Sequence, residues 1–352
     1  MRTKQSVKFV AYIWLLVLVI LTALVIVTIQ GIRNNFSANG DRSLSPVSSA
    51  NCRTIKHEMG ETKVCGQPKK IVVFGSPILE SLLTLDIQPS GFADYFMFHK
   101  GNFDKPSQQI PYLGNRITTQ PANLGLLSSP SIEAILKGQP DLILGTQYNA
   151  SQYKILSKIA PTLLLDWNNA EKNLKTIAEA IGSSKKAEPL LAETKQQIKT
   201  ARDSFAPIVA KSPKMLLLHS GKLQDIYLGD DAFGLCSSLI KKLGFQLILP
   251  PELNKNYPVS VSIETLSQFN DADSIILLGS NFSKLDNENS FKEHQLLNLK
   301  QAWEKNAIAQ SLKASKNGRV YFIPYYMCAG LPGSIGTKLY LRELKKQLLS
   351  AS

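Results

Sequence analysis

The chain has 352 residues, with 40 lysines and arginines against 27 aspartates and glutamates, which gives a formal charge of +13. This length accommodates two domains of ordinary size. The basic residues are scattered through helical patterns and form no stripe interleaved with aromatic residues, which argues against nucleic acid as a partner. We expect a solvated basic surface instead.

The N-terminal stretch is typical of a membrane-inserting segment. An uncharged apolar run, Phe9 to Ile29, follows a short basic stub. A helix of this length spans a hydrocarbon core of about 30 Å, and the preceding positive charges favour a cytoplasmic N-terminus. A cleaved signal peptide is the alternative, but the run exceeds its usual core of roughly 7–15 residues. We predict residues 1–8 as a cytoplasmic stub, 9–30 as a transmembrane anchor or signal, and 31–51 as a flexible linker.

The four cysteines indicate disulfide chemistry. Cys52 and Cys65 could bind zinc with His57, but this gives only three ligands. Because an export signal implies oxidising surroundings, a disulfide is the simpler interpretation, and it would stabilise the fold by roughly 3 kcal/mol. Cys236 and Cys328 could form a second bridge, which the sequence leaves open because distance cannot be judged from it.

Strands and helices alternate after the first cysteine pair. Ile71–Phe74 reads as a buried strand, Ile78–Leu85 as a helix and Gly91–Ala93 as a second strand. This order predicts a parallel sheet with right-handed crossovers. The stretch 130–149 continues it, with Ser131 as a helix N-cap and a buried strand that ends near Gly145.

The second half of the sequence shows the same alternation of helical and strand patterns. Two helical patterns, Asn173–Gly182 and Lys185–Phe205, precede a strand at Met215–Leu218. The segments PSIEAIL…PDLILG and VSIETLS…ADSIILLG then form an internal repeat of helix plus strand. We therefore expect two similar α/β units, one for each copy.

The stretch PSIEAILKGQPDLILG, followed by LSKIAPTLLLD, resembles the N-terminal lobe of the iron–siderophore, haem and cobalamin binding proteins of bacterial ABC importers. The resemblance extends from about residue 52 to the C-terminus. It implies an α/β fold in which two parallel-sheet lobes are joined by one long helix. The implied boundaries are 52–167 for the N-terminal ligand-binding lobe, 168–210 for the linking helices and 211–352 for the C-terminal ligand-binding lobe.

Aromatic and cationic residues in the predicted loops suit a bulky ligand that carries anionic oxygens. Family members use an arginine and a tyrosine of the first lobe and an aromatic residue before the glutamate-bearing helix of the second. Arg116, Tyr148 and Tyr257 match these positions, although the extra residues 117–129 leave the aim of Arg116 open. The predicted ligand-binding residues are Tyr95, Arg116, Tyr148, His219, Tyr257 and Tyr326.

Glu133 and Glu264 occupy equivalent places in the repeat. The resemblance implies that one glutamate per lobe pairs with arginines on the importer's membrane subunits. The alternative is that each carboxylate only neutralises a helix dipole, which is worth about 0.3–1 kcal/mol.

No motif indicates catalysis or a resident cofactor. The four histidines lack metal-binding spacing, and residues 330–338, GLPGSIGTK, resemble a phosphate loop but have the wrong order and glycine spacing. We expect a monomeric binding protein, tethered on the periplasmic or other extracytoplasmic face of the membrane, that delivers an iron(III)–siderophore complex to an ABC importer. The alternatives are a haem or cobalamin binding protein of the same family, and a membrane-anchored enzyme or sensor on the same scaffold.

Overall fold

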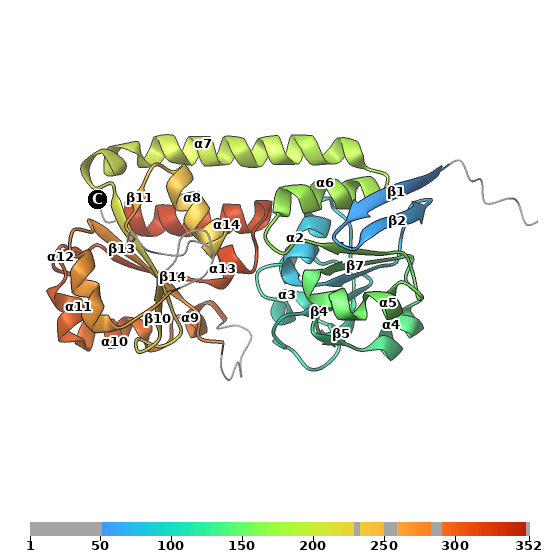
Figure 1. The fold of residues 1–352 in the computed structure, drawn as a ribbon, viewed down its shortest axis with the longest axis horizontal. Helices are drawn as coiled ribbons and strands as arrows, with labels where there is room; N and C mark the ends of the chain where they lie inside the picture. The colour runs from blue at the N-terminus through green and yellow to red at the C-terminus, as the bar shows by residue number, and fades with distance from the viewer. Residues whose placement is uncertain (1–50, 229–232, 250–258, 283–290, 350–352) are drawn as a thin grey trace, which may run out of the picture. The chain divides into compact units, whose positions relative to one another are not determined.

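The computed structural model describes residues 51–228, 233–249, 259–282 and 291–349. The predicted membrane segment, residues 9–30, lies outside these ranges. Within them, no helix is long and apolar enough to cross a membrane. The residues from Cys52 onward group into one compact unit (Figure 1).

A disulfide-closed hairpin opens this unit. Strands β1 (Cys52–His57) and β2 (Gly60–Cys65) pair antiparallel, and the Cys52–Cys65 disulfide joins directly opposed residues. The predicted bridge is confirmed. Nδ1 of His57 accepts the Leu164 N–H at 3.2 Å, so this imidazole holds the hairpin against the first sheet, and the described residues contain no cluster suited to a metal ion.

The first sheet has the strand order β6-β5-β4-β3-β7-β8. All neighbouring pairs run parallel except β5 and β6. With its helices and the hairpin, this sheet forms what we call the N-terminal half. Its elements are β3 (Ile71–Phe74), α2 (Ser76–Thr84), β4 (Gly91–Asp94), α3 (Pro106–Gln109), η2 (Gly114–Arg116), β5 (Ala122–Leu126), β6 (Ser129–Pro130), α4 (Ile132–Gly138), β7 (Leu142–Thr146), η3 (Gln147–Gln152), α5 (Tyr153–Leu156), β8 (Thr162–Leu165), α6 (Ala170–Ala180) and η4 (Ser184–Lys186).

The second sheet has the strand order β12-β10-β9-β13-β14, with β11 paired to β9. This sheet and its helices form the C-terminal half. Its elements are β9 (Lys214–Ser220), β10 (Ile226–Leu228), α8 (Leu235–Lys242), β11 (Gln246–Leu247), β12 (Val259–Val261), η6 (Ile263–Phe269), β13 (Ser274–Gly279), α9 (Phe291–Gln295), α10 (Leu299–Lys305), α11 (Ala307–Ser311), α12 (Lys313–Lys316), β14 (Val320–Pro324), α13 (Tyr326–Ala329), α14 (Ser334–Leu344) and the π-helical η8 (Lys345–Leu349).

The prediction of two parallel sheets is confirmed only in part, because both sheets are mixed. Strand β10 runs antiparallel to both of its neighbours, β9 and β12. The links 221–225 and 127–128 are too short for a parallel crossover, which needs about a dozen residues or more. Both short links therefore close as antiparallel turns.

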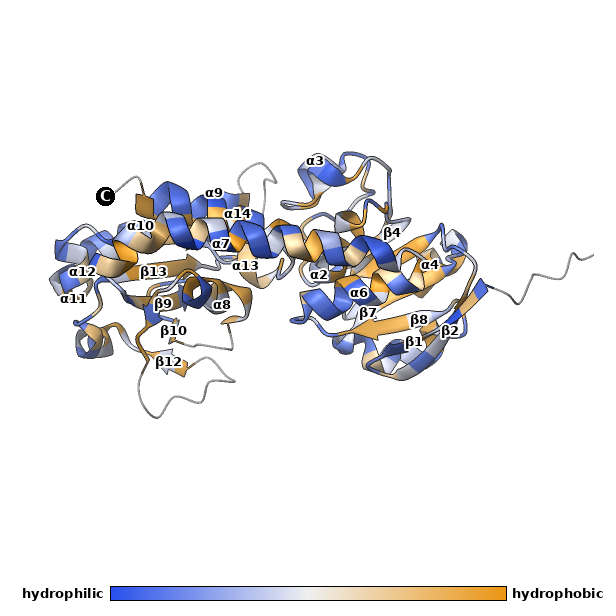
Figure 2. Ribbon diagram, turned by 90° about the horizontal axis from the view of Figure 1, so that it is seen from above, coloured by the Kyte–Doolittle hydropathy of each residue, from blue (hydrophilic) through white to orange (hydrophobic). Residues whose placement is uncertain are grey.

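Each sheet is buried on both faces, as its apolar strands predict. In β7, Leu142 and Leu144 pack with helices α2 and α6, whereas Ile143 packs with α4 and α5. In the second sheet, α7, α8 and α14 cover one face, and η6 with α10–α12 cover the other. Figure 2 shows the hydrophobic residues concentrated in the strands.

One helix connects the two halves. Helix α7 (Ala187–Lys211) has 25 residues and extends past the predicted end at Phe205, through Pro207. Proline disfavours helix interiors because it lacks an N–H. The helix continues beyond Pro207 because Phe205 is buried in the core of the C-terminal half, and because Ile208 and Val209 pack against the same core.

Candidate functional site

A cavity of about 250 Å³ lies between the two halves, at the carboxyl ends of strands from both sheets. Ligands of open α/β sheets gather at this edge, where loops leave the parallel strands. Seven of the nine residues that line the cavity are aromatic: Tyr95, Phe96, Tyr148, Trp167, Phe282, Tyr325 and Tyr326.

The N-terminal half contributes three rings that touch edge to face. Tyr95 follows β4, Tyr148 follows β7, and Trp167 follows β8. The ring centroids lie 6.1 Å apart for Tyr95–Tyr148, 5.8 Å for Tyr95–Trp167 and 5.7 Å for Tyr148–Trp167. Tyr95 and Tyr148 are 50% and 52% exposed, so these rings offer a large apolar surface to a ligand.

The C-terminal half supplies the opposite wall. Phe282 follows β13 and contacts Phe96 with ring centroids 4.6 Å apart. Tyr325 follows β14, and Tyr326 is only 3% exposed. The hydroxyl of Tyr326 donates a hydrogen bond to Oδ2 of Asp94 in the other half, at 2.9 Å.

His219 lies behind this wall. Its ring stacks on Tyr325 with centroids 4.0 Å apart, and its Nε2 is buried without a hydrogen-bond partner. Burial lowers the pKa of His219 to about 4. The imidazole is therefore neutral at pH 7 and supports Tyr325, without lining the cavity.

Among the predicted site residues that the structure describes, His219 and Arg116 do not line the cavity. Arg116 is exposed on η2 and does not line it; the carbonyl of Arg116 accepts a hydrogen bond from Gln88 Nε2 at 3.1 Å. The residues after Arg116 lead into β5 and β6 at the sheet edge, so the inserted segment builds strands where the sequence suggested a loop. Tyr257 lies outside the described residues.

Four of the aromatic cavity residues were not predicted from the sequence: Phe96, Trp167, Phe282 and Tyr325. Trp167 carries a recognisable signal, because it comes two residues after the buried strand β8. Tyr325 likewise comes directly after β14.

Tyr148 and Tyr325 keep their phenol protons at neutral pH. Burial raises the pKa of Tyr325 to about 12, and it also raises the pKa of Tyr148, with help from Tyr95 and Asp166. Phenol hydroxyls that keep their protons can donate hydrogen bonds to anionic oxygens. The arrangement can therefore contact part of a bulky chelate with apolar rings and donate hydrogen bonds to some of its oxygens.

The two repeated glutamates lie on exposed surface, one in each half. Ser131 Oγ accepts the Ala134 N–H at 3.2 Å and caps α4, with Glu133 in its first turn. In the second copy Ser262 precedes η6, which is a 3-10 helix. A hydrogen bond from Ser262 lowers the pKa of Glu264.

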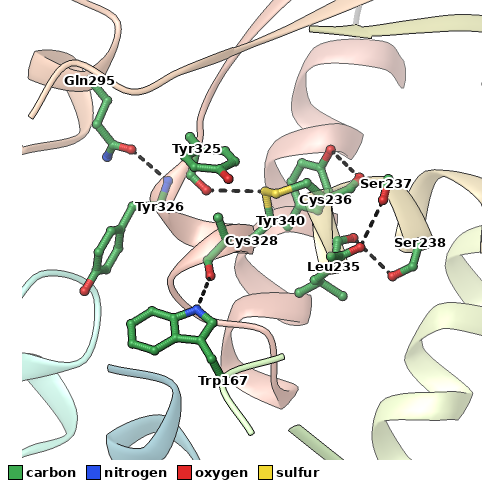
Figure 3. Close-up of a disulfide and its surroundings, with 12 residues drawn as sticks. Trp167, Leu235, Cys236, Ser237, Ser238, Gln295, Tyr325, Tyr326, Cys328 and Tyr340 are labelled. Atoms are coloured by element: carbon green, nitrogen blue, oxygen red, sulfur yellow. Dashed lines mark hydrogen bonds between the residues drawn. A yellow bond between two sulfur atoms is a disulfide. The ribbon is translucent and has the colours of Figure 1, made fainter. Parts of the chain in front are cut away.

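A second disulfide, which the sequence left open, joins Cys236 of α8 to Cys328 of α13. Cys328 lies between the cavity residues Tyr326 and Ala329. Figure 3 shows Tyr325 and Tyr326 beside this disulfide, with Trp167 approaching from the N-terminal half. The bridge therefore fixes the segment that carries one wall of the cavity.

Comparison with protein families gives a match over most of the described unit. The family described as "Periplasmic binding protein" matches residues 71–326.

Two curated relatives from Bacillus subtilis (strain 168) cover most of the chain. A putative ABC transporter substrate-binding lipoprotein, YhfQ, is 29% identical over 346 residues, which is 95% of this chain and 98% of the relative. The Fe(3+)-citrate-binding protein YfmC is 28% identical, covering 81% of this chain and 82% of the relative.

Among solved structures, SirA of Staphylococcus aureus in complex with staphyloferrin B has a TM-score of 0.66 at 24% identity. The match covers 84% of this chain and 98% of SirA. FeuA of Bacillus subtilis in complex with ferri-bacillibactin has a TM-score of 0.62 at 24% identity, covering 85% of this chain and 98% of FeuA. These similarities establish the fold.

Proposed function

Because the chain belongs to the periplasmic binding protein family, we propose that it is the substrate-binding component of an ABC importer and captures iron(III)–siderophore complexes outside the cytoplasmic membrane. The aromatic cavity carries this proposal. It lies where this fold class binds ligands, and its rings suit a bulky chelate. The names of relatives as substrate-binding or Fe(3+)-citrate-binding proteins support the same assignment.

Within the cavity, Tyr95, Tyr148 and Trp167 form the ligand-facing wall of the N-terminal half. Tyr325 and Phe282 form the opposing wall, with His219 supporting Tyr325. Arg116 is not part of this proposed set, since it does not line the cavity. Iron enters as cargo inside its chelator, so no side chain has to ligate it.

A titration tests the function. The full-length chain, in mild detergent, receives Fe³⁺–citrate, Fe³⁺–Desferal, ferri-bacillibactin, ferric staphyloferrin B, haem or cobalamin, and tryptophan emission is followed. We expect sub-micromolar quenching by one ferric chelate, because Trp167 lies on the cavity wall. Quenching by haem or cobalamin alone would replace the siderophore assignment with that ligand, and no response to any ferric chelate would contradict it.

We also propose that Glu133 and Glu264 dock the protein on the importer's membrane subunits. Each is exposed and lies away from the cavity lining. Glu133→Lys or Glu264→Lys should therefore leave ligand affinity within about twofold and abolish iron uptake by whole cells. Glu179→Lys, the same charge reversal on exposed α6, is the matched control. Normal uptake by both docking variants would refute the assignment.

We further propose that the protein is a monomer and stays tethered to the membrane through residues 9–30, with residues 31–51 as the linker. The proposed ligand-binding lobes are residues 52–167 and 211–352. The mass of the mature protein recovered from membranes shows whether the N-terminal segment is retained or cleaved. An intact N-terminus supports the tether, and a mass that lacks the apolar run supports cleavage.

A further inference from the structure

One segment of the C-terminal half packs as if it belonged to the N-terminal half. We call Tyr326–Gly336 the crossing segment. Tyr326, Leu331 and Ile335 are 3%, 0% and 7% exposed and belong to the hydrophobic core of the N-terminal half, whereas Met327 and Cys328 belong to the core of the C-terminal half. The crossing segment also carries part of the cavity wall.

Polar groups of the N-terminal half bind the start of this segment. Asp94 Oδ2 accepts the Tyr326 hydroxyl, while Asp94 Oδ1 accepts the N–H of Tyr95 at 2.7 Å. One carboxyl group thus joins the two facing walls of the cavity. Ser76 Oγ donates to the Gly330 carbonyl at 3.0 Å, and Trp167 Nε1 donates to the Ala329 carbonyl at 3.4 Å.

Glu80 of α2 binds the end of the segment. Its two carboxyl oxygens accept the N–H groups of Gly333 and Gly336, both at 2.7 Å. These amides belong to the first turn of α14, which has no side-chain N-cap of its own. A Cβ on Gly333 would come within 2.8 Å of the Glu80 carboxyl group, so a larger residue at this position would force that carboxyl group to shift.

The glycine-rich stretch 330–338 therefore binds a carboxyl group of the same chain. The free N–H groups at a helix N-terminus are hydrogen-bond donors that need acceptors. Here the acceptors are the carboxyl oxygens of Glu80, which the opposite half supplies.

We propose that Asp94 and Glu80 are positioning residues for ligand capture: they lock the crossing segment onto the N-terminal half, so that both walls of the aromatic cavity are held in place before a ligand arrives. The ligand part of this inference rests on the proposed function, whereas the locking part does not. Because the crossing segment shares one core and five hydrogen bonds with the N-terminal half, movement of the two sheets cannot separate this segment from that half without breaking these contacts.

The lock depends on pH. Burial raises the pKa of Glu80 to about 7, opposed by backbone N–H groups and by Arg116. Burial raises the pKa of Asp94 to about 6, opposed by the Tyr95 N–H and the Tyr326 hydroxyl. Other charged groups facing Glu80 lie on the walls of an adjoining cavity of about 380 Å³: Glu171, Lys195 and Lys242.

The raised pKa values determine whether stability rises or falls with pH. Each folded carboxyl group holds its proton more tightly than the unfolded chain does, so its contribution to stability is full below about pH 4. Glu80 and Asp94 lose this contribution as the pH rises through about 7 and about 6.

Amide hydrogen exchange of the ligand-free, full-length chain tests the lock. Glu80→Gln should accelerate exchange in the crossing segment by about tenfold or more, because a glutamine presents one acceptor oxygen to two N–H donors. It should also flatten the fall of Tm between pH 5 and 8. The control is Glu179→Gln, the same change on exposed α6. Equal protection and equal pH profiles in both variants would overturn the inference.

A second variant keeps the test decisive if Glu80→Gln fails to fold. Tyr326→Phe retains the buried ring and removes only the hydroxyl that binds Asp94. Exchange at 326–330 should again rise about tenfold, relative to Tyr321→Phe on β14. Unchanged exchange in Tyr326→Phe would show that Asp94 does not hold the segment.

The effect on ligand binding is tested with whichever chelate quenches the tryptophan emission of the wild type: Fe³⁺–citrate, Fe³⁺–Desferal, ferri-bacillibactin or ferric staphyloferrin B. Asp94→Asn should raise its Kd about tenfold and remove a pH step near 6. The effects of Asp94→Asn and Tyr326→Phe should not add, because both break one contact. If no chelate binds the wild type, the proposed function fails, and the exchange experiment still decides the lock.

Discussion

Replacing Tyr95 and Tyr148 together by alanine should weaken binding of the captured ferric chelate by about a hundredfold or more. The two rings are half exposed on one wall of the cavity, and an aromatic anchor at the centre of a binding site typically contributes more than about 1.4 kcal/mol, a factor of ten in Kd. Fluorescence titration of the double variant measures this loss.

The matched control is the double variant Tyr95→Phe/Tyr148→Phe, which keeps both rings and removes their hydroxyls. This variant should retain most of the ligand affinity if apolar contact dominates. Its loss of affinity relative to the wild type measures the contribution of the hydrogen bonds to ligand oxygens. An alanine pair that binds as tightly as the wild type would move the ligand site elsewhere.

Removing the Cys236–Cys328 bridge should be the most damaging single change to stability. The bridge joins residues 92 positions apart, and the chain-entropy account gives roughly 4–5 kcal/mol for a loop of this size. The Cys236→Ala/Cys328→Ala variant should therefore unfold at markedly lower urea concentration. Since Cys328 lies within the cavity wall, ligand affinity should fall as well.

The other disulfide of the chain, Cys52–Cys65, provides the control for this prediction. Cys52→Ala/Cys65→Ala opens a bridge of separation 13, for which the same account gives roughly 3 kcal/mol, and it lies away from the cavity. A larger stability loss from the hairpin pair than from the second pair would contradict this ranking.

Local pattern was sufficient to predict many elements. Strand β3, Ile71–Phe74, has the predicted bounds, and the serine cap on α4 forms its expected hydrogen bond. These features depend on short-range chemistry, which a sequence carries directly. The direction of a strand does not follow from hydrophobic periodicity; it depends on the length of links such as 221–225, which is too short for a parallel crossover.

The site was harder to predict because tertiary packing decides it. Tyr95 and Tyr148 were found from their place after buried strands, and both line the cavity. Arg116 matched by local spacing, yet it lies on η2, outside the lining. Trp167 and Phe282 meet there only because strands far apart in sequence end side by side.

The crossing segment also has a consequence for how the protein is made. Tyr326, Leu331 and Ile335 complete a core whose other members begin at Ile55, so that core stays unfilled until nearly the whole chain has been synthesised. Contacts of such long sequence separation slow folding and leave apolar surface exposed meanwhile. Nascent chains stopped before residue 326 should therefore bind chaperones through their N-terminal half, even though its sheet is already fully encoded.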